Sequence, residues 1–149
     1  MQVTKRDGKK ESFSVEKIHK VVEWATKGIN GVSFSDIEMN ANLSLYDGIS
    51  TTEIHKILIK SANDLISTSS PNYQYVAARL LNMELRKEVW GYGDQPTDFL
   101  LFLQRNTDNG LYDPLILEKW TSKKIDLLGN YINHSRDDLF TYAGLQQMI

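Results

Sequence analysis

Residues 46–55 decide the fold, and they read Tyr46-Asp47-Gly48-Ile49-Ser50-Thr51-Thr52-Glu53-Ile54-His55. Asp47-Gly48 predicts a tight turn, because glycine adopts a positive φ without steric cost. Ser50 and Glu53 follow with the Ser-x-x-Glu spacing of a capping box, which satisfies free backbone N–H groups where a helix begins. Apolar residues then recur at helical spacing. We therefore predict a helix over residues 51–66 that starts directly after a turn.

The chain before this helix predicts a β-hairpin and two further helices. Residues 3–6 and 11–13 can extend, and Asp7-Gly8 between them is a strong turn signal. From Val15 onward, apolar residues at helical spacing predict a helix that stops near Gly28. A second Ser-x-x-Glu signature at residues 35–38 predicts a helix that ends near Tyr46.

A fourth helix is predicted over residues 73–90, after a Ser-rich connector that contains Pro71. Its apolar residues suggest burial over more than one face, and Gly91 and Gly93 end it. Four helices and a hairpin can bury a core of useful size for a small domain. The predicted fold class is therefore mainly α with a small β element, in which a four-helix unit over residues 1–92 is capped by the hairpin.

Residues 93–149 are predicted to form a separate helical segment after a boundary near residues 91–96. The pattern indicates a helix over residues 97–109, a short helix after Asp113-Pro114 and another over residues 121–133. Residues 137–145 show no clear closing element. We therefore expect the sequence to be cut rather than finished.

Composition limits the classes of function. The formal net charge of -2 gives no general electrostatic case for binding nucleic acid or an anionic membrane, so we expect neither as a partner. The absence of cysteine excludes disulfides, Cys-ligated zinc and thiol-based catalysis in this chain. No apolar run approaches the length of a membrane helix, and the N-terminus lacks the apolar stretch of a signal peptide. A cytoplasmic location is the simplest expectation.

Basic residues from three separate stretches suggest a polyphosphate site. A triphosphate needs several cations in one small volume, helped by the N–H groups of a helix start. The hairpin offers Lys5 and Arg6, the helix start at residue 51 offers Thr51 and, one turn later, His55, and the fourth helix offers Lys87. Taken singly, Lys87 is typical of a solvated surface lysine and His55 of a half-exposed helix histidine. Neither a P-loop nor a Gly-x-Gly-x-x-Gly turn is present.

Six motifs at matching separations resemble the ATP-cone of the large (alpha) subunit of class I ribonucleotide reductase, in its bacterial and phage forms. The motifs lie in order over residues 1–92: Val3-Thr4-Lys5-Arg6-Asp7-Gly8, Lys17-Ile18, Tyr46-Asp47-Gly48-Ile49-Ser50-Thr51-Thr52-Glu53-Ile54-His55, Asp64-Leu65-Ile66, Pro71-Asn72-Tyr73-Gln74-Tyr75-Val76-Ala77-Ala78-Arg79-Leu80 and Leu85-Arg86-Lys87. The stretches 110–113 and 134–142 are similar to the segment that leads from this cone into the catalytic barrel.

The resemblance implies a role for each matching position. The phosphate group would be bound by Lys5, Arg6, Thr51, His55 and Lys87. Glu11 would be the partner of the adenine amino group, and Lys17, a weaker match, would reach ribose or phosphate. The apolar walls around the base would be Val3, Phe13, Ile18 and Ile54. Phe13 departs from the isoleucine often found in the family, but it remains apolar, so the pocket should survive.

The resemblance also implies a function. The domain would bind ATP or dATP, with Mg²⁺ arriving on the nucleotide, and would switch the overall activity of a ribonucleoside-diphosphate reductase, an oxidoreductase that makes deoxyribonucleotides for DNA synthesis. Its partners would be the rest of the large subunit and the small radical-bearing subunit, in assemblies that respond to nucleotide. Reduction in this family requires cysteines, and this chain has none. We therefore expect the chain to be regulatory and not catalytic by itself.

Three alternatives remain open at this point. ATP-cones also occur in transcriptional regulators, but those carry a Cys-rich zinc ribbon, which zero cysteine disfavours. The cone could belong to an anaerobic glycyl-radical reductase, although the continuation after Gly93 favours class I. The third alternative is a helical interaction module that binds no nucleotide and whose cations are merely solvated.

Overall fold

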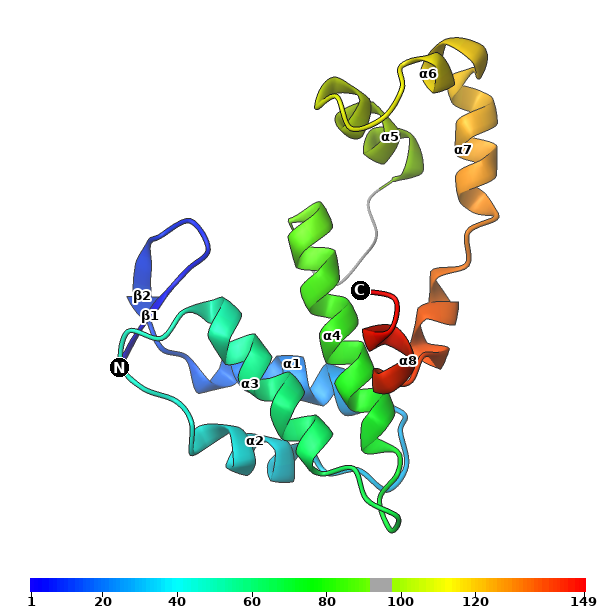
Figure 1. The fold of residues 1–149 in the computed structure, drawn as a ribbon. Coiled ribbons are helices and arrows are strands. Elements are labelled where there is room, and N and C mark those ends of the chain that lie inside the picture. Colours follow the sequence, from blue (N-terminus) through cyan, green and yellow to red (C-terminus); the bar gives the residue numbers. More distant parts are fainter. Residues whose placement is uncertain (92–97) are drawn as a thin grey trace.

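The computed structural model describes residues 1–91 and 98–149. Its elements lie in the order given by this list (Figure 1): β1 Gln2–Thr4, β2 Lys10–Ser12, α1 Val15–Thr26, α2 Phe34–Asn42, α3 Thr51–Asp64, α4 Tyr73–Trp90, α5 Phe99–Asp108, α6 Leu115–Lys119, α7 Ser122–Asn130, the 3-10 helix η1 His134–Leu139, and α8 Tyr142–Gln146. The predicted fold class, mainly α with a small β element, is confirmed. The predicted boundary near residues 91–96 and the predicted helix start at Thr97 lie largely outside the described residues.

The N-terminal hairpin forms where the turn signal predicts it, with its strands displaced by about a residue. β1 and β2 pair antiparallel, with Val3 opposite Glu11 and Thr4 opposite Lys10. The loop between them closes through the N–H of Lys5, which donates to the carbonyl of Lys9 at 2.8 Å. Gly8 has a φ of 81°, a conformation that other residues rarely adopt. Lys5 and Arg6 therefore lie in the loop and not in a strand.

The hairpin is fastened to the turn that precedes α3. The N–H of Thr4 donates to the carbonyl of Ile49 at 3.0 Å, and Thr4 and Ser50 form an isolated parallel bridge. The N–H of Gln2 donates to the Oδ1 atom of Asp47 at 2.7 Å. Gly48 has a φ of 83°, which lets the backbone reverse beside β1. The loop cations are thereby held next to the start of α3.

One of the two predicted capping boxes exists. Ser50 and Glu53 form the complete box: the N–H of Glu53 donates to the Ser50 hydroxyl at 3.1 Å, and the N–H of Ser50 donates to the Glu53 carboxylate at 3.0 Å. The box predicted at residues 35–38 is wrong. Ser33 occupies the N-cap of α2 and accepts from the N–H of Asp36 at 3.3 Å, so the helix begins earlier and ends at Asn42.

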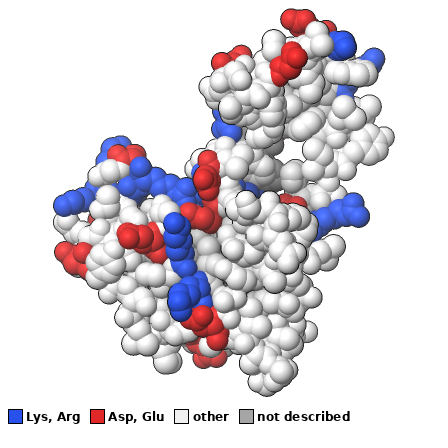
Figure 2. All heavy atoms as spheres, viewed as in Figure 1, with Lys and Arg blue, Asp and Glu red and all other residues white. Residues whose placement is uncertain are grey.

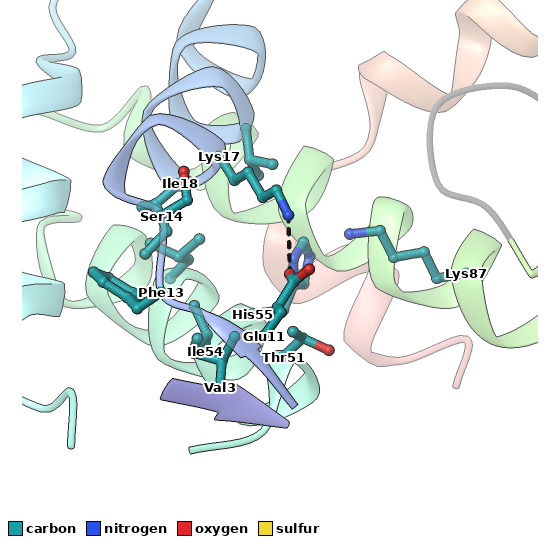
Figure 3. Close-up of a pocket in the computed structure, with 12 residues that line it drawn as sticks. Val3, Glu11, Phe13, Ser14, Lys17, Ile18, Thr51, Ile54, His55 and Lys87 are labelled. Carbon is teal, nitrogen blue, oxygen red and sulfur yellow. Dashed lines mark hydrogen bonds and ion pairs between the residues drawn. The ribbon is translucent and has the colours of Figure 1, made fainter. Parts of the chain in front are cut away.

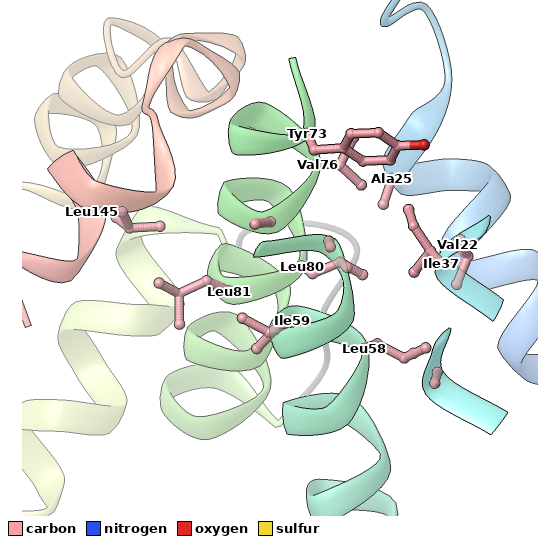
Figure 4. Close-up of a cluster of buried hydrophobic side chains, with 13 residues drawn as sticks. Val22, Ala25, Ile37, Leu58, Ile59, Tyr73, Val76, Leu80, Leu81 and Leu145 are labelled. Atoms are coloured by element: carbon pink, nitrogen blue, oxygen red, sulfur yellow. The ribbon is translucent and has the colours of Figure 1, made fainter. Parts of the chain in front are cut away.

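Helices α1 to α4 enclose the main core, in which α3 and α4 form an extensively contacting pair (Figure 4). The largest fully buried side chains of this core are Val22, Ile37, Val76 and Leu80. A second, smaller cluster lies beneath the hairpin and consists of Val3, Ile49 and Ile54, with Phe13 and Ile18 packed against it. Burial of these side chains supplies the main driving force that holds the hairpin on the helices.

The C-terminal stretch folds back onto α4, which the sequence pattern did not predict. Residues 134–146 form η1 and α8, and both contact α4 (Figure 1). Leu145 is buried within the main core. Two ion pairs add to this contact: Arg86 lies 2.6 Å from Asp137, and Arg79 lies 3.6 Å from Asp138. Helices α5 to α7 lie apart from the main core, with α5 packed on α7.

None of the helices within residues 1–91 and 98–149 is both long and apolar enough to cross a bilayer.

Candidate functional site

An apolar cavity lies between the hairpin, α1, α3 and α4 (Figure 3). Its space, including the part open to solvent, is about 530 Å³. The four predicted wall residues all line it: Val3, Phe13, Ile18 and Ile54. These residues also belong to the small cluster beneath the hairpin, so the same packing that positions β1 shapes the wall of the cavity. A flat aromatic ring is the kind of ligand that such a surface accommodates.

A second cavity, of about 960 Å³ including open solvent, adjoins the hairpin loop. Its cations are Lys5, Arg6, Lys17 and Lys87. They reach it from the loop, from α1 and from α4. Figure 2 shows Lys and Arg side chains gathered over the hairpin end of the molecule, with acidic side chains among them. Such a concentration of cations beside the N-terminus of α3 suits an anion with several charges.

The two cavities share Glu11, Lys17, Thr51 and Lys87, so they form one bipartite site. Each of the eleven residues that the sequence indicated lines at least one of the two cavities. The structure therefore brings together residues from positions 3 to 87. An apolar cavity that adjoins a cationic cavity suits a nucleotide, which has a flat apolar base and a charged phosphate chain.

Glu11 lies where the cavities meet. Its carboxylate bridges two lysines, with 2.9 Å to Lys5 and 2.9 Å to Lys17. Hydrogen bonds from Lys5 and then Lys17 lower the pKa of the Glu11 carboxyl, so it stays ionised at neutral pH. The same pairing raises the pKa of the Lys5 ammonium. Glu11 can thus accept a hydrogen bond from a ligand in the apolar cavity while it holds two cations near the rim.

Arg6 pairs with a carboxylate that the sequence did not single out. Its guanidinium lies 2.8 Å from Glu84 of α4. The side chain of Glu84 is 12% exposed, against 39% for Arg6. The other oxygen of Glu84 lies 3.9 Å from the Nε2 atom of His55.

His55 is buried, at 4% exposure, and differs from the half-exposed histidine that its sequence position suggested. Its Nε2–H donates to the carbonyl of Leu80 at 2.7 Å, because a carbonyl can only accept. Burial is the largest influence on the imidazole and lowers its pKa. The hydrogen bond to the Leu80 carbonyl, the next largest, raises the pKa. Among the neighbouring charges, Lys87 and Arg6 lower the pKa and Glu84 raises it. His55 is therefore neutral at pH 7, and Nδ1 is the ring nitrogen left for a ligand. It lines the apolar cavity and not the cationic one.

Several lining residues were not among the candidates that the sequence indicated. Ser14, Val21 and Leu58 complete the apolar cavity, and Asp7 and Gly91 complete the cationic one. Val21 lies one turn after Ile18, and Leu58 one turn after Ile54, so helical periodicity would have found both. Ser14 occupies the N-cap of α1 without a side-chain capping bond, so its hydroxyl is not committed to the helix start.

The chain belongs to the ATP cone domain family, since the model of that family matches residues 1–88. It is 41% identical over 146 residues to ribonucleoside-diphosphate reductase 1 subunit alpha of Salmonella typhimurium and 40% identical over 146 residues to that of Escherichia coli. It is 39% identical over 150 residues to ribonucleoside-diphosphate reductase subunit alpha of Enterobacteria phage T4.

These alignments cover nearly all of this chain but a small part of each relative. They include 98% of the chain for the two bacterial proteins and 99% for the phage protein. The chain spans 19% of the length of each of these relatives. The resemblance inferred from the six motifs is thereby confirmed for the family.

Proposed function

We propose that this chain is the adenine-nucleotide effector domain of a ribonucleoside-diphosphate reductase alpha subunit. One observation carries the proposal: an apolar cavity and a cationic cavity meet at Glu11, Lys17, Thr51 and Lys87. The adenine ring would occupy the apolar cavity, against Val3, Phe13, Ile18 and Ile54. The polyphosphate would occupy the cationic cavity.

The two ends of the ligand have separate recognition chemistry. Glu11 is ionised and would accept a hydrogen bond from the adenine amino group, which a guanine does not offer at that ring position. Lys5, Arg6 and Lys87 would bind phosphate oxygens through charge-assisted hydrogen bonds. Thr51 would contribute from the first turn of α3, where the helix dipole favours an anion. Mg²⁺ would arrive on the nucleotide and offset part of its charge.

The regulatory effect would arise from linkage. ATP and dATP differ by one ribose hydroxyl, and a ligand shifts an equilibrium only through its different affinities for the two states. We propose that the states are assemblies of the alpha subunit with the small radical-bearing subunit. In this proposal the whole enzyme makes deoxyribonucleotides, and this chain supplies its regulation.

Calorimetric titration of ATP, dATP and GTP tests nucleotide binding, with light scattering on the same samples to detect assembly. We expect ATP and dATP to bind and GTP to bind more weakly. At 100 times its Kd a ligand stabilises the folded chain by about 2.7 kcal/mol, which a thermal melt detects. Absence of both heat and thermal stabilisation with ATP and with dATP would contradict the proposal and favour a helical interaction module.

A further inference from the structure

The ion pair between Arg6 and Glu84 places an internal carboxylate on one of the cations that would bind phosphate. The Arg6 guanidinium lies 2.8 Å from the Glu84 carboxylate. Arg6 lines the cationic cavity, whereas Glu84 is not among the residues that line it. Glu84 is therefore positioned to act on a ligand through Arg6 rather than by direct contact.

The two partners differ in exposure and in the element that carries them. Glu84 projects from α4, whose helix is anchored in the main core by Val76 and Leu80. Arg6 lies in the hairpin loop, and its side chain is about three times as exposed, at 39% against 12%. When the pair separates, Arg6 is thus the partner that moves, and it can turn toward the cavity while Glu84 stays in place.

The surroundings of Glu84 make Arg6 its principal partner. Its buried Oε2 atom has no hydrogen-bond partner within the part of the chain that the structure describes. His55 is the nearest other candidate, at 3.9 Å, but its Nε2–H is already donated to the Leu80 carbonyl. A carboxylate that is largely removed from water needs a paired cation to offset its desolvation. Glu84 therefore pairs with Arg6 when no other anion is present.

Glu84 also reduces the net positive charge around the cationic cavity. Four cations line the cationic cavity, namely Lys5, Arg6, Lys17 and Lys87, together with the carboxylates of Asp7 and Glu11. With Glu84 behind Arg6, these four cations face three carboxylates, which leaves a formal charge of +1. Neutralising Glu84 would double that surplus to +2. A nearby negative charge disfavours an incoming anion, especially where burial reduces screening.

From these observations, and resting on the proposed function, we infer that Glu84 is an internal competitor of the nucleotide phosphates for Arg6. The chain then has two arrangements of one guanidinium: paired with Glu84 without ligand, and turned to a phosphate oxygen when a triphosphate is bound. Glu84 lowers the affinity for polyphosphate and leaves recognition of the base unchanged.

The test is calorimetric titration of the 149-residue chain and its Glu84→Gln variant with ATP, ADP, AMP and adenosine. Glutamine keeps the size of the side chain and an oxygen that accepts from Arg6, but removes the charge. We expect Glu84→Gln to bind ATP about fivefold more tightly, the scale of one ion pair of modest strength. The gain should shrink from ATP to AMP and vanish for adenosine. A purely structural role would change all four ligands alike.

Two further variants make the result specific. Glu88→Gln removes the same charge from an exposed position on α4, and it should leave ATP affinity within about twofold. Arg6→Gln removes the cation for which the anions compete. In the Arg6→Gln background, Glu84→Gln should lose most of its effect on ATP binding. If Glu84→Gln does not fold, Glu84→Asp, which withdraws the carboxylate from Arg6, should change affinity in the same direction.

The outcomes separate this inference from the proposed function. If the unaltered chain does not bind ATP, the proposed function itself fails. If the unaltered chain binds ATP but Glu84→Gln weakens binding or leaves it unchanged, the competition is refuted. An equal gain with adenosine would also refute it, because adenosine carries no phosphate.

Discussion

Individual side chains of the cationic cavity differ in how they are held. Arg6 is paired with Glu84, and Lys5 and Lys17 share Glu11. Figure 3 shows Lys87 extending from α4 toward the side of the cavity where Lys17 and Glu11 meet. Lys87 lines both cavities, so we expect it to be close to any ligand that fills the site.

We predict that Lys87→Ala weakens triphosphate binding by about 1.5–3 kcal/mol, the range for a lost hydrogen bond to a charged group. The Kd for ATP should then rise about 10- to 150-fold in a calorimetric titration. Lys123→Ala removes an exposed lysine of α7 and serves as the matched control, with an unchanged Kd expected. An unaltered Kd in Lys87→Ala would remove this residue from the site.

The burial of His55 predicts a pH dependence of stability. Desolvation lowers the pKa of its imidazole below the usual value of 6.5. The Leu80 carbonyl and Glu84 oppose this effect, and Lys87 and Arg6 add to it. The unfolded chain takes up this proton near pH 6.5, whereas the folded chain resists it. The stabilisation is therefore fully present above pH 6.5 and is lost as the pH falls toward the lowered pKa.

Urea unfolding of the chain at pH 7.5 and at pH 5.5 measures this effect, with His55→Gln as the comparison. Glutamine can still donate to the Leu80 carbonyl but does not titrate. We expect the free energy of unfolding to fall less between the two pH values in His55→Gln than in the unaltered chain. Equal losses in both proteins would show that His55 does not contribute to the acid sensitivity.

Among the secondary-structure elements, α3 has the most fully formed start. Its capping box satisfies backbone N–H groups, and hydrogen bonds from Ser50 lower the pKa of the Glu53 carboxyl. Ser50 also pairs with Thr4 of β1, so the residue that caps α3 also positions the hairpin. A helix start that is held at both points keeps Thr51 where the two cavities meet.

We predict that Ser50→Ala lowers the free energy of unfolding by about 1 kcal/mol, the typical cost of a lost N-cap hydrogen bond. Thr121→Ala is a control from the same chain, because Thr121 is the N-cap of α7 but makes no side-chain capping bond. Chemical denaturation of both variants should show a clear loss for Ser50→Ala and little for Thr121→Ala. Equal losses would mean that the hydrogen bond contributes nothing beyond the residue's propensity.

In the whole molecule, helix α4 is in contact on two sides, with the candidate site on one and with the C-terminal segment on the other. One contributes Lys87, Glu84 and the Leu80 carbonyl to the neighbourhood of the site. The other receives η1 and α8, through the Arg86–Asp137 ion pair and the buried Leu145. The C-terminal segment therefore contributes to the core that supports the site. The division into units at residues 92 and 93 remains a prediction.

We predict that Leu145→Ala lowers the free energy of unfolding of the chain by about 2 kcal/mol, at the low end for a buried leucine because α8 is short. Leu139→Ala is the matched control, since Leu139 lies in the adjoining η1 and is 74% exposed. Thermal and urea unfolding should distinguish the two variants. If both behave like the unaltered chain, the contact between α8 and α4 does not stabilise the core.

The sequence by itself determined most of the helices, the hairpin turn and the α3 cap, because these depend on short-range patterns: helical periodicity, the positive φ of glycine and capping spacing. Residues 46–55 were sufficient to predict both the turn and the start of α3. The eleven candidate site residues also came from the sequence, through six motifs whose order and separation resemble one family. The false start at Ser35 shows the limit of such patterns, since Ser33, two residues earlier, caps the helix by accepting from the N–H of Asp36.

Tertiary structure alone decided several individual contacts and the burial of His55. Helical periodicity says nothing about the Arg86–Asp137 contact, whose partners are 51 residues apart, or about the choice of Glu84 as the partner of Arg6. Tertiary structure also decided that His55 is buried and neutral, because desolvation depends on everything that packs around the ring. The physical reason is common to all three: charge pairing and burial are properties of three-dimensional surroundings, which residues distant in the chain supply.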